Sequence, residues 1–100
     1  MATVIHHIDL IVSNPEIRSG RPCIAQTGIT VADVAIAKVF HKKDADEIAE
    51  WYDLTLPQVY SALAYYYTHK GEIDESIQDR RDRALQLKEQ LLAKRPSLLP

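Results

Sequence analysis

Five residues in the middle of the chain carry side chains that DNA recognition uses. Thr55, Gln58 and Ser61 have hydroxyl or amide groups that can hydrogen-bond to base edges. Lys42 and Lys43 are adjacent cations, and phosphate contacts supply most of the affinity for DNA. An alternative interpretation makes the two lysines a solvated helix end that interacts with the helix dipole. These five residues are the candidate DNA-contacting set.

Other chemistry fits the sequence poorly, and we expect no enzyme, metal site or cofactor. The sequence has no glycine-rich phosphate loop and no paired-cysteine motif. His6 and His7 are adjacent, so on a strand they point to opposite faces, whereas a zinc site needs about four converging ligands. The single Cys23 follows Pro22 in a predicted strand and is interpreted as a buried residue rather than a nucleophile.

Length and composition indicate one globular domain over residues 1–100. Hydrophobic residues make up 46% and charged residues 26%, and the net charge of −2 gives no overall basic field. The N-terminus has neither a basic start nor an unbroken apolar run, so no signal peptide is expected. No stretch approaches the ~20 apolar residues that cross a bilayer. We therefore expect a cytoplasmic protein with no membrane contact.

Three helix-start signals predict a trihelical unit over residues 30–70. Each signal places a capping side chain three residues before a carboxylate or amide, which satisfies free N–H groups at a helix start. The signals are Thr30 with Asp33, Asp44 with Glu47, and Thr55 with Gln58. The predicted helices cover residues 31–41, 45–52 and 56–70. We expect Gly71 to end the third helix in a left-handed conformation.

Apolar residues at helical spacing predict the inward face of each helix. The first face is Val31, Val34, Ala35, Val39 and Phe40, and the second is Ala45, Ile48, Ala49 and Tyr52. The third face is Leu56, Val59, Tyr60, Leu63 and Tyr67.

The second and third predicted helices have the pattern of a helix-turn-helix. Ala49 is small where the two helices must cross, Leu54 can fill the turn, and Val59 and Ala62 can face back to the first helix. Asp53 stands where such a turn usually has glycine, and aspartate can adopt the left-handed conformation at moderate cost. A trihelical core that shares this geometry without contacting DNA stays open as an alternative.

The two flanks of this unit carry apolar residues that the chain itself has little means to cover. Residues 4–12 are rich in β-branched residues and predict a strand, which a second short strand joins in a hairpin arm over 4–29. A long helix is predicted over 72–94, with a charged middle and an apolar C-terminal half. We expect a homodimer, because two copies can bury these residues against each other. The candidate partner or dimer contacts are Ile8, Leu10, Val12, Leu85, Leu87, Leu91 and Leu92.

The order of motifs along residues 8–78 resembles a known family. The matching segments are Asn14-Pro15-Glu16-Ile17, Gly20-Arg21-Pro22-Cys23-Ile24, Thr27-Gly28-Ile29-Thr30-Val31, Glu47-Ile48, Tyr52-Asp53-Leu54-Thr55, Gln58-Val59, Ala62-Leu63-Ala64-Tyr65-Tyr66 and Glu72-Ile73-Asp74. They are similar to bacterial domain-of-unknown-function family 433. The chain departs from the family at Gln26-Thr27-Gly28, where members usually carry Gly-Thr-Arg.

This resemblance implies a homeodomain-like trihelical fold and an antitoxin association. The expected function is an antitoxin-type DNA-binding protein that is paired with a PIN-like ribonuclease toxin and regulates its own operon. The alternative is a protein-interaction or assembly module that does not bind DNA. The segment Gly20-Arg21-Pro22 has no assigned role beyond shaping the turn between the strands. The expected fold class is mainly α: a short N-terminal β-hairpin, a trihelical helix-turn-helix unit and a long C-terminal helix.

Overall fold

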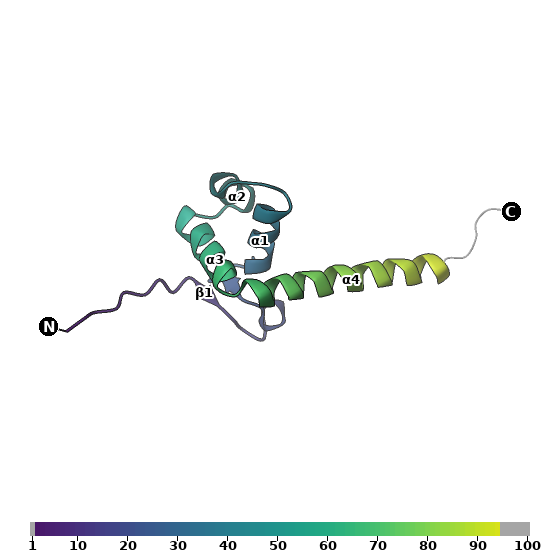
Figure 1. The fold of residues 1–100 in the computed structure, drawn as a ribbon, viewed down its shortest axis with the longest axis horizontal. Helices are drawn as coiled ribbons and strands as arrows, with labels where there is room; N and C mark the ends of the chain where they lie inside the picture. The colour runs from purple at the N-terminus through teal and green to yellow at the C-terminus, as the bar shows by residue number, and fades with distance from the viewer. Residues whose placement is uncertain (1, 95–100) are drawn as a thin grey trace. The chain divides into compact units, whose positions relative to one another are not determined.

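The structure, a computed structural model, describes residues 2–94 and is mainly helical (Figure 1). The chain divides into two compact units between His69 and Lys70, and each is described by itself. The first contains β1 (Ile11–Val12), a 3-10 turn η1 (Arg18–Gly20), β2 (Cys23–Ile24), α1 (Val31–Val39), α2 (Ala45–Tyr52) and α3 (Leu56–Thr68). The second contains α4 (Lys70–Lys94). The predicted class, with an N-terminal hairpin, helices and a long C-terminal helix, is confirmed.

All three predicted capping boxes form, which explains where α1, α2 and α3 begin. In the first, the N–H of Asp33 donates to Thr30 Oγ1 and the N–H of Thr30 donates to Asp33 Oδ2, both at 3.0 Å. The same reciprocal bonds join Asp44 with Glu47 and Thr55 with Gln58. Each box satisfies N–H groups that lack a partner within the helix.

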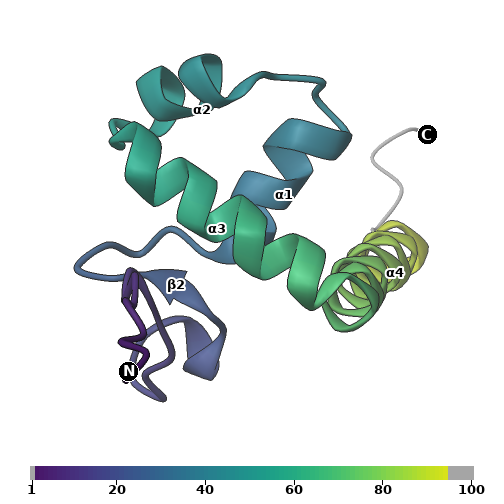
Figure 2. The ribbon, with the colours of Figure 1, turned by 60° about the vertical axis from the view of Figure 1, so that its left-hand side comes forward.

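The core of the first unit lies where α1, α2 and α3 pack on one another (Figure 2). It is aliphatic apart from one tyrosine, and strand β2 contributes to it. The buried apolar side chains are Cys23, Ile24, Val31, Val34, Ala35, Ala37, Ala45, Ile48, Val59, Ala62, Leu63 and Tyr66. This core fixes α2 and α3 relative to each other and so positions the turn between them.

The buried face of α3 differs from the predicted one. Val59 and Leu63 are buried as predicted, and so is Ala62, which the helix-turn-helix pattern places inward, while Tyr66 completes the face. Predicted inward residues that are instead 38–58% exposed are Leu56, Tyr60 and Tyr67 of α3, and Val39 and Phe40 at the end of α1. Both stripes on α3 have the helical period, so the packing surface selects between them. The small Ala62 allows a close approach between helices that a tyrosine would prevent.

The predicted glycine stop after α3 is wrong. The chain leaves the helical conformation at His69, with φ −117° and ψ 32°. Gly71 lies inside α4 and has no positive φ. Hydrogen bonds from the His69 N–H to the carbonyls of Tyr65 and Tyr66 end α3 without a glycine.

The N-terminal hairpin is much shorter than predicted. Only Ile11 and Val12 of the predicted strand 4–12 are in β1, which pairs antiparallel with β2 in the register Ile11 with Ile24. The reason is the turn that follows β2: Gln26 has φ 64° and the Thr27 N–H donates to the Ile24 carbonyl, so the chain turns away before it can pair with residues 4–9. In the connection between β1 and β2, Gly20 has φ +81°, a conformation that glycine adopts without the steric cost that other residues have.

α4 is a helix of 25 residues, and it begins at Lys70, two residues before the predicted range of 72–94. Four of its leucines are 55–62% exposed: Leu85, Leu87, Leu91 and Leu92. Among the helices of residues 2–94, none has both the length and the apolar character that a bilayer span requires.

Candidate nucleic-acid interface

The turn between α2 and α3 is built on a left-handed aspartate. Asp53 has φ 56° and ψ 50°, and its N–H donates to the carbonyls of Ala49 and Glu50. The N–H of Leu54 then donates to the Ala49 carbonyl at 2.8 Å. The prediction that Asp53 adopts the left-handed conformation in place of the usual glycine is therefore confirmed. The turn joins α2 to α3 in three residues.

Thr55 and Gln58 lie at the start of α3, and their side chains bond to each other. Gln58 Oε1 accepts from the Thr55 N–H at 2.8 Å and from the Thr55 hydroxyl at 3.2 Å. Thr55 Oγ1 accepts from the Gln58 N–H at 3.3 Å. The oxygens of both side chains therefore serve the helix cap, and the Gln58 amide NH₂ is the group left to donate to a base.

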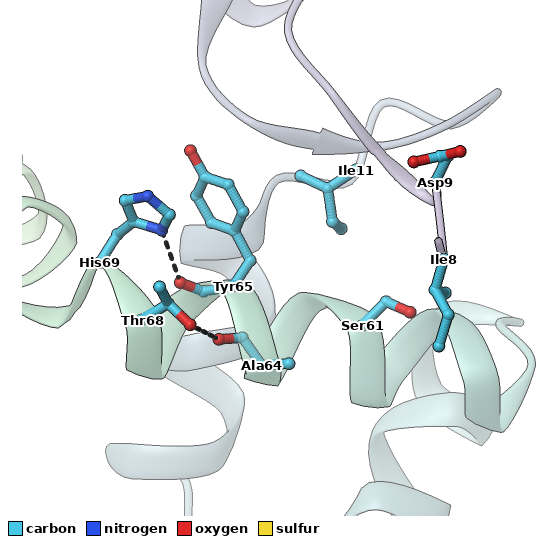
Figure 3. A pocket seen from close by; sticks show the side chains of 8 residues that line it. All are labelled: Ile8, Asp9, Ile11, Ser61, Ala64, Tyr65, Thr68 and His69. Atoms are coloured by element: carbon cyan, nitrogen blue, oxygen red, sulfur yellow. Dashed lines mark hydrogen bonds between the residues drawn. The ribbon is translucent and has the colours of Figure 1, made fainter. Parts of the chain in front are cut away.

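Ser61 has different neighbours from the other candidates. It lines an open groove of about 370 Å³ between α3 and the N-terminal arm, which we define as residues 2–10 (Figure 3). The lining residues are Ile8, Asp9, Ile11, Ser61, Ala64, Tyr65, Thr68 and His69. At one end the rings of Tyr65 and His69 stack at a centroid distance of 4.1 Å. Ser61 therefore lies beside the arm. Of the three candidates at or near the start of α3, only Thr55 and Gln58 are hydrogen-bonded to each other.

Lys42 and Lys43 lie in the connection between α1 and α2. Lys42 is exposed and has φ 57°, and the Lys43 N–H donates to the Ala37 carbonyl of α1 at 3.1 Å, so both lysines lie in a left-handed turn that follows the end of α1. Lys43 Nζ lies 4.6 Å from the ring centroid of Trp51, within the range of a cation–π interaction. Of the two predicted phosphate ligands, Lys43 therefore lies against an aromatic ring and Lys42 is exposed to solvent.

Trp51 is a feature of this surface that the sequence prediction missed. It is 54% exposed, and its ring packs edge-on against His41 at 5.9 Å and stacks on Tyr52 at 5.7 Å. The available signal was its position, because Trp51 falls outside the apolar stripe of its helix and must therefore face away from the core.

Carboxylates dominate the surface of α2 and work against DNA binding. The exposed acids of this region are Asp44, Asp46, Glu47, Glu50 and Asp53. Up to His69 the sequence has five Lys and Arg against eight Asp and Glu, a formal net charge of −3. The acids near the start of α2 interact favourably with the helix dipole, but they also repel phosphates.

Cys23 is buried, as predicted. It is 3% exposed, and its Sγ donates to the Arg21 carbonyl at 3.2 Å. Loss of solvation raises the pKa of the thiol, and the Asp33 carboxylate raises it further against the opposing effects of Arg18 and Arg21. A thiol that stays protonated is a poor nucleophile. Among the described residues, no cluster of three or more His, Cys, Asp or Glu is arranged to hold a metal ion.

The predicted partner contacts lie in two places, the N-terminal part of the chain and α4. Ile8 is 78% and Val12 43% exposed, while Leu10 is half-buried. The four leucines of α4 are all more than half exposed. The structure therefore leaves apolar side chains in solvent in both places.

Comparison with known proteins identifies the family. A search of curated proteins and a search of solved structures gave no match. The family model described as "Protein of unknown function (DUF433)" matches residues 11–66, which run from β1 into α3 and exclude α4. This range is shorter than the 8–78 of the sequence resemblance, and it covers the hairpin, the three capping boxes and the Asp53 turn. The chain therefore belongs to the DUF433 family.

Proposed function

We propose that this chain is a cytoplasmic, antitoxin-type DNA-binding protein that acts as two copies. The observation that carries the proposal is the left-handed Asp53 turn between α2 and α3. Helix-turn-helix proteins use this arrangement to present the second helix to the major groove. The resemblance to family 433 supports the rest of the proposal, in which a PIN-like ribonuclease toxin is the partner and the operon is autoregulated.

Lys42 supplies the principal phosphate contact in this proposal, and Lys43 adds to it when its ammonium leaves Trp51. The Gln58 amide, as a donor, suits the acceptors at a guanine or thymine edge. Because residues 1–69 carry a net charge of −3, one copy binds weakly, and two copies are needed to combine their contacts. The exposed leucines of α4 supply an apolar surface for the toxin.

A second candidate function is an assembly module that does not contact DNA. The acidic surface of α2 favours it, because five carboxylates next to the turn repel a phosphate backbone. In this alternative the trihelical unit only forms a core, and the apolar flanks bind proteins.

A DNA-binding assay with the full chain separates the two candidates. The probe is the duplex upstream of the chain's own coding sequence, with a shuffled duplex as competitor, at low and at moderate salt. The DNA-binding proposal predicts a specific complex that weakens as salt rises, since counterions are released on binding. Absence of a specific complex at low salt contradicts the proposal and favours the assembly module.

Charge reversal identifies the phosphate contacts. Lys42→Glu with Lys43→Glu is expected to weaken binding to both duplexes, whereas Gln58→Ala reduces the preference for the specific duplex with a smaller loss of affinity. The matched control is Arg83→Glu with Lys88→Glu on α4, which changes the net charge equally at exposed positions. Equal weakening by both pairs would assign the effect to net charge alone.

A further inference from the structure

The N-terminal arm is an apolar segment whose backbone is paired with the described part of the chain only at Leu10. Val4, Ile5 and Ile8 are 72–78% exposed, which is more than any other large apolar residue among those described. Residues 3–9 make no hydrogen bond to any of residues 2–94. The segment is nevertheless rich in β-branched residues, which favour strands. It has the composition of a strand and lacks a neighbour to pair with.

The pairing of β1 fixes which backbone groups of the arm are free. The Ala25 N–H donates to the Leu10 carbonyl at 2.8 Å, so in the register Ile11 with Ile24 the backbone groups of Leu10 and Val12 point toward β2. Those of Ile11 point away from it. When the strand continues toward the N-terminus, the odd-numbered residues Ile5, His7 and Asp9 present their N–H and C=O groups on the same outer edge.

The other edge of β2 is already occupied. The N–H of Ile24 donates to the Ile29 carbonyl at 2.9 Å, and Cys23 forms a bridge with Thr30. The outer edge of β1 is therefore the edge at which the small sheet can grow, and exposed strand edges are sites of pairing with another chain.

We infer that the arm pairs antiparallel with the arm of a second copy about a two-fold axis, with Ile8 opposite Ile8. The inference rests on the dimer of the proposed function and names the surface that forms it. Two hairpins then join through their arms into one antiparallel sheet, which is more stable than an isolated two-stranded ribbon.

The register follows from strand parity and charge. Because odd-numbered residues face the partner strand, an odd-numbered residue must stand opposite another odd-numbered residue. With Ile8 on the axis, His7 stands opposite Asp9 twice, and an imidazole meets a carboxylate in both pairs. The apolar pairs are Val4 with Val12, Ile5 with Ile11, and Ile8 with its copy.

The two neighbouring registers are worse. A shift in one direction places Asp9 opposite Asp9, and like charges directly opposite are destabilising. A shift in the other direction places His7 opposite His7 and Ile5 opposite Asp9. The His7 and Asp9 side chains thus select one register among those that the backbone allows.

Single cysteines in the full chain test this register without DNA. Ile8 opposite its copy is a non-hydrogen-bonded pair, and its Cα separation of ~4.5 Å is compatible with a disulfide. Under mild oxidation Ile8→Cys is expected to form a covalent dimer, at a several-fold higher fraction than His7→Cys or Asp9→Cys. The wild-type chain, with its buried Cys23, gives the background. Equal crosslinking at the three positions, or most at His7 or Asp9, overturns the register.

Mass measurement separates this inference from the proposed function. The native dimer is expected to dissociate in Ile8→Lys and to persist in Leu87→Lys, its matched control on α4. Dissociation by Leu87→Lys alone would place the dimer contact on α4, which overturns the arm pairing and leaves the proposed function standing. A wild-type mass of 11.3 kDa overturns both. A dimer crosslinked through Ile8→Cys that shows no specific DNA complex contradicts only the proposed function.

Discussion

The trihelical unit of residues 30–69 and the two flanks of the chain treat apolar residues in opposite ways. In the trihelical unit each helix begins with a capping box, and most of its aliphatic side chains are buried in one core, with Val39 and Leu56 as exceptions. In the N-terminal arm and in α4 the large apolar side chains are mostly exposed. The unit pairs the N–H groups at its helix starts and buries most of its aliphatic side chains, whereas the flanks expose aliphatic side chains that another molecule can cover.

This contrast indicates where mutations change stability and where they change association. Burial of a side chain in the unit contributes to the free energy of unfolding, because that side chain is removed from water in the single chain. An exposed leucine of α4 contributes only when a partner covers it.

Truncation in the core is expected to have the largest effect. Ile48 is fully buried, so Ile48→Ala removes apolar contacts and leaves a cavity, which lowers the free energy of unfolding by about 3 kcal/mol. Leu87→Ala, at a position 56% exposed, is expected to change it by less than ~0.5 kcal/mol. Urea denaturation measures both. A comparable loss in the two variants would contradict the division between unit and flank.

Loss of a cap is expected to cost less than loss of core packing. Thr55→Ala removes the acceptor of the Gln58 N–H at the start of α3, which lowers the free energy of unfolding by about 1 kcal/mol. Thr68→Ala near the end of α3 is the control, because that exposed hydroxyl donates only to the Ala64 carbonyl behind it. Thermal denaturation distinguishes the two. Equal effects would mean that the capping box does not stabilise α3.

The turn is expected to respond to backbone preference. Asp53 has a positive φ, so Asp53→Gly relieves steric strain and raises the free energy of unfolding by about 0.5 kcal/mol, while Asp53→Val lowers it by about 1 kcal/mol. Asp46→Gly, inside α2, serves as the control and is expected to destabilise. A destabilised Asp53→Gly variant would show that the carboxylate, rather than the backbone, maintains the turn.

The contact between Lys43 and Trp51 is expected to give the smallest effect. A double-mutant cycle with Lys43→Ala and Trp51→Ala should yield a coupling free energy of about 0.5 kcal/mol, because the site is exposed. A parallel cycle with Lys42→Ala and Trp51→Ala is expected to give none. Coupling of equal size in both cycles would show a general effect of charge near the ring.

Local signals predicted much of the trihelical unit and of the candidate site. Helix α2 has the predicted ends, because Asp44 and Glu47 fix its start and Asp53 its end through bonds within a few residues. The Asp53 turn was predicted for the same reason, since the left-handed preference of aspartate is a property of the residue. The capping pair of Thr55 and Gln58 was also predicted from the sequence. The side-chain oxygens of both residues take part in this cap, which conflicts with base recognition by those oxygens.

Signals that depend on a distant partner were less informative. The arm has strand-forming residues from Val4 to Val12, yet only Ile11 and Val12 pair, because pairing needs a second strand and β2 is short. Gly71 carries a helix-stop signal, yet α3 already ends at His69 and Gly71 lies in the first turn of α4. The placement of Lys43 against Trp51 depends on the connection between α1 and α2, which brings together residues from two elements.

Residue types at short spacing are enough to predict the capped helix starts, the left-handed turn and the family. The full buried face of α3, by contrast, depends on how α1 and α2 pack against it. Two stripes of apolar residues share the helical period, and Tyr66 is buried beside the predicted Ala62, whereas Tyr60 and Tyr67 are exposed. The physical reason is that periodicity records which side chains lie on one face, whereas burial depends on the shape of the surface that packs against it.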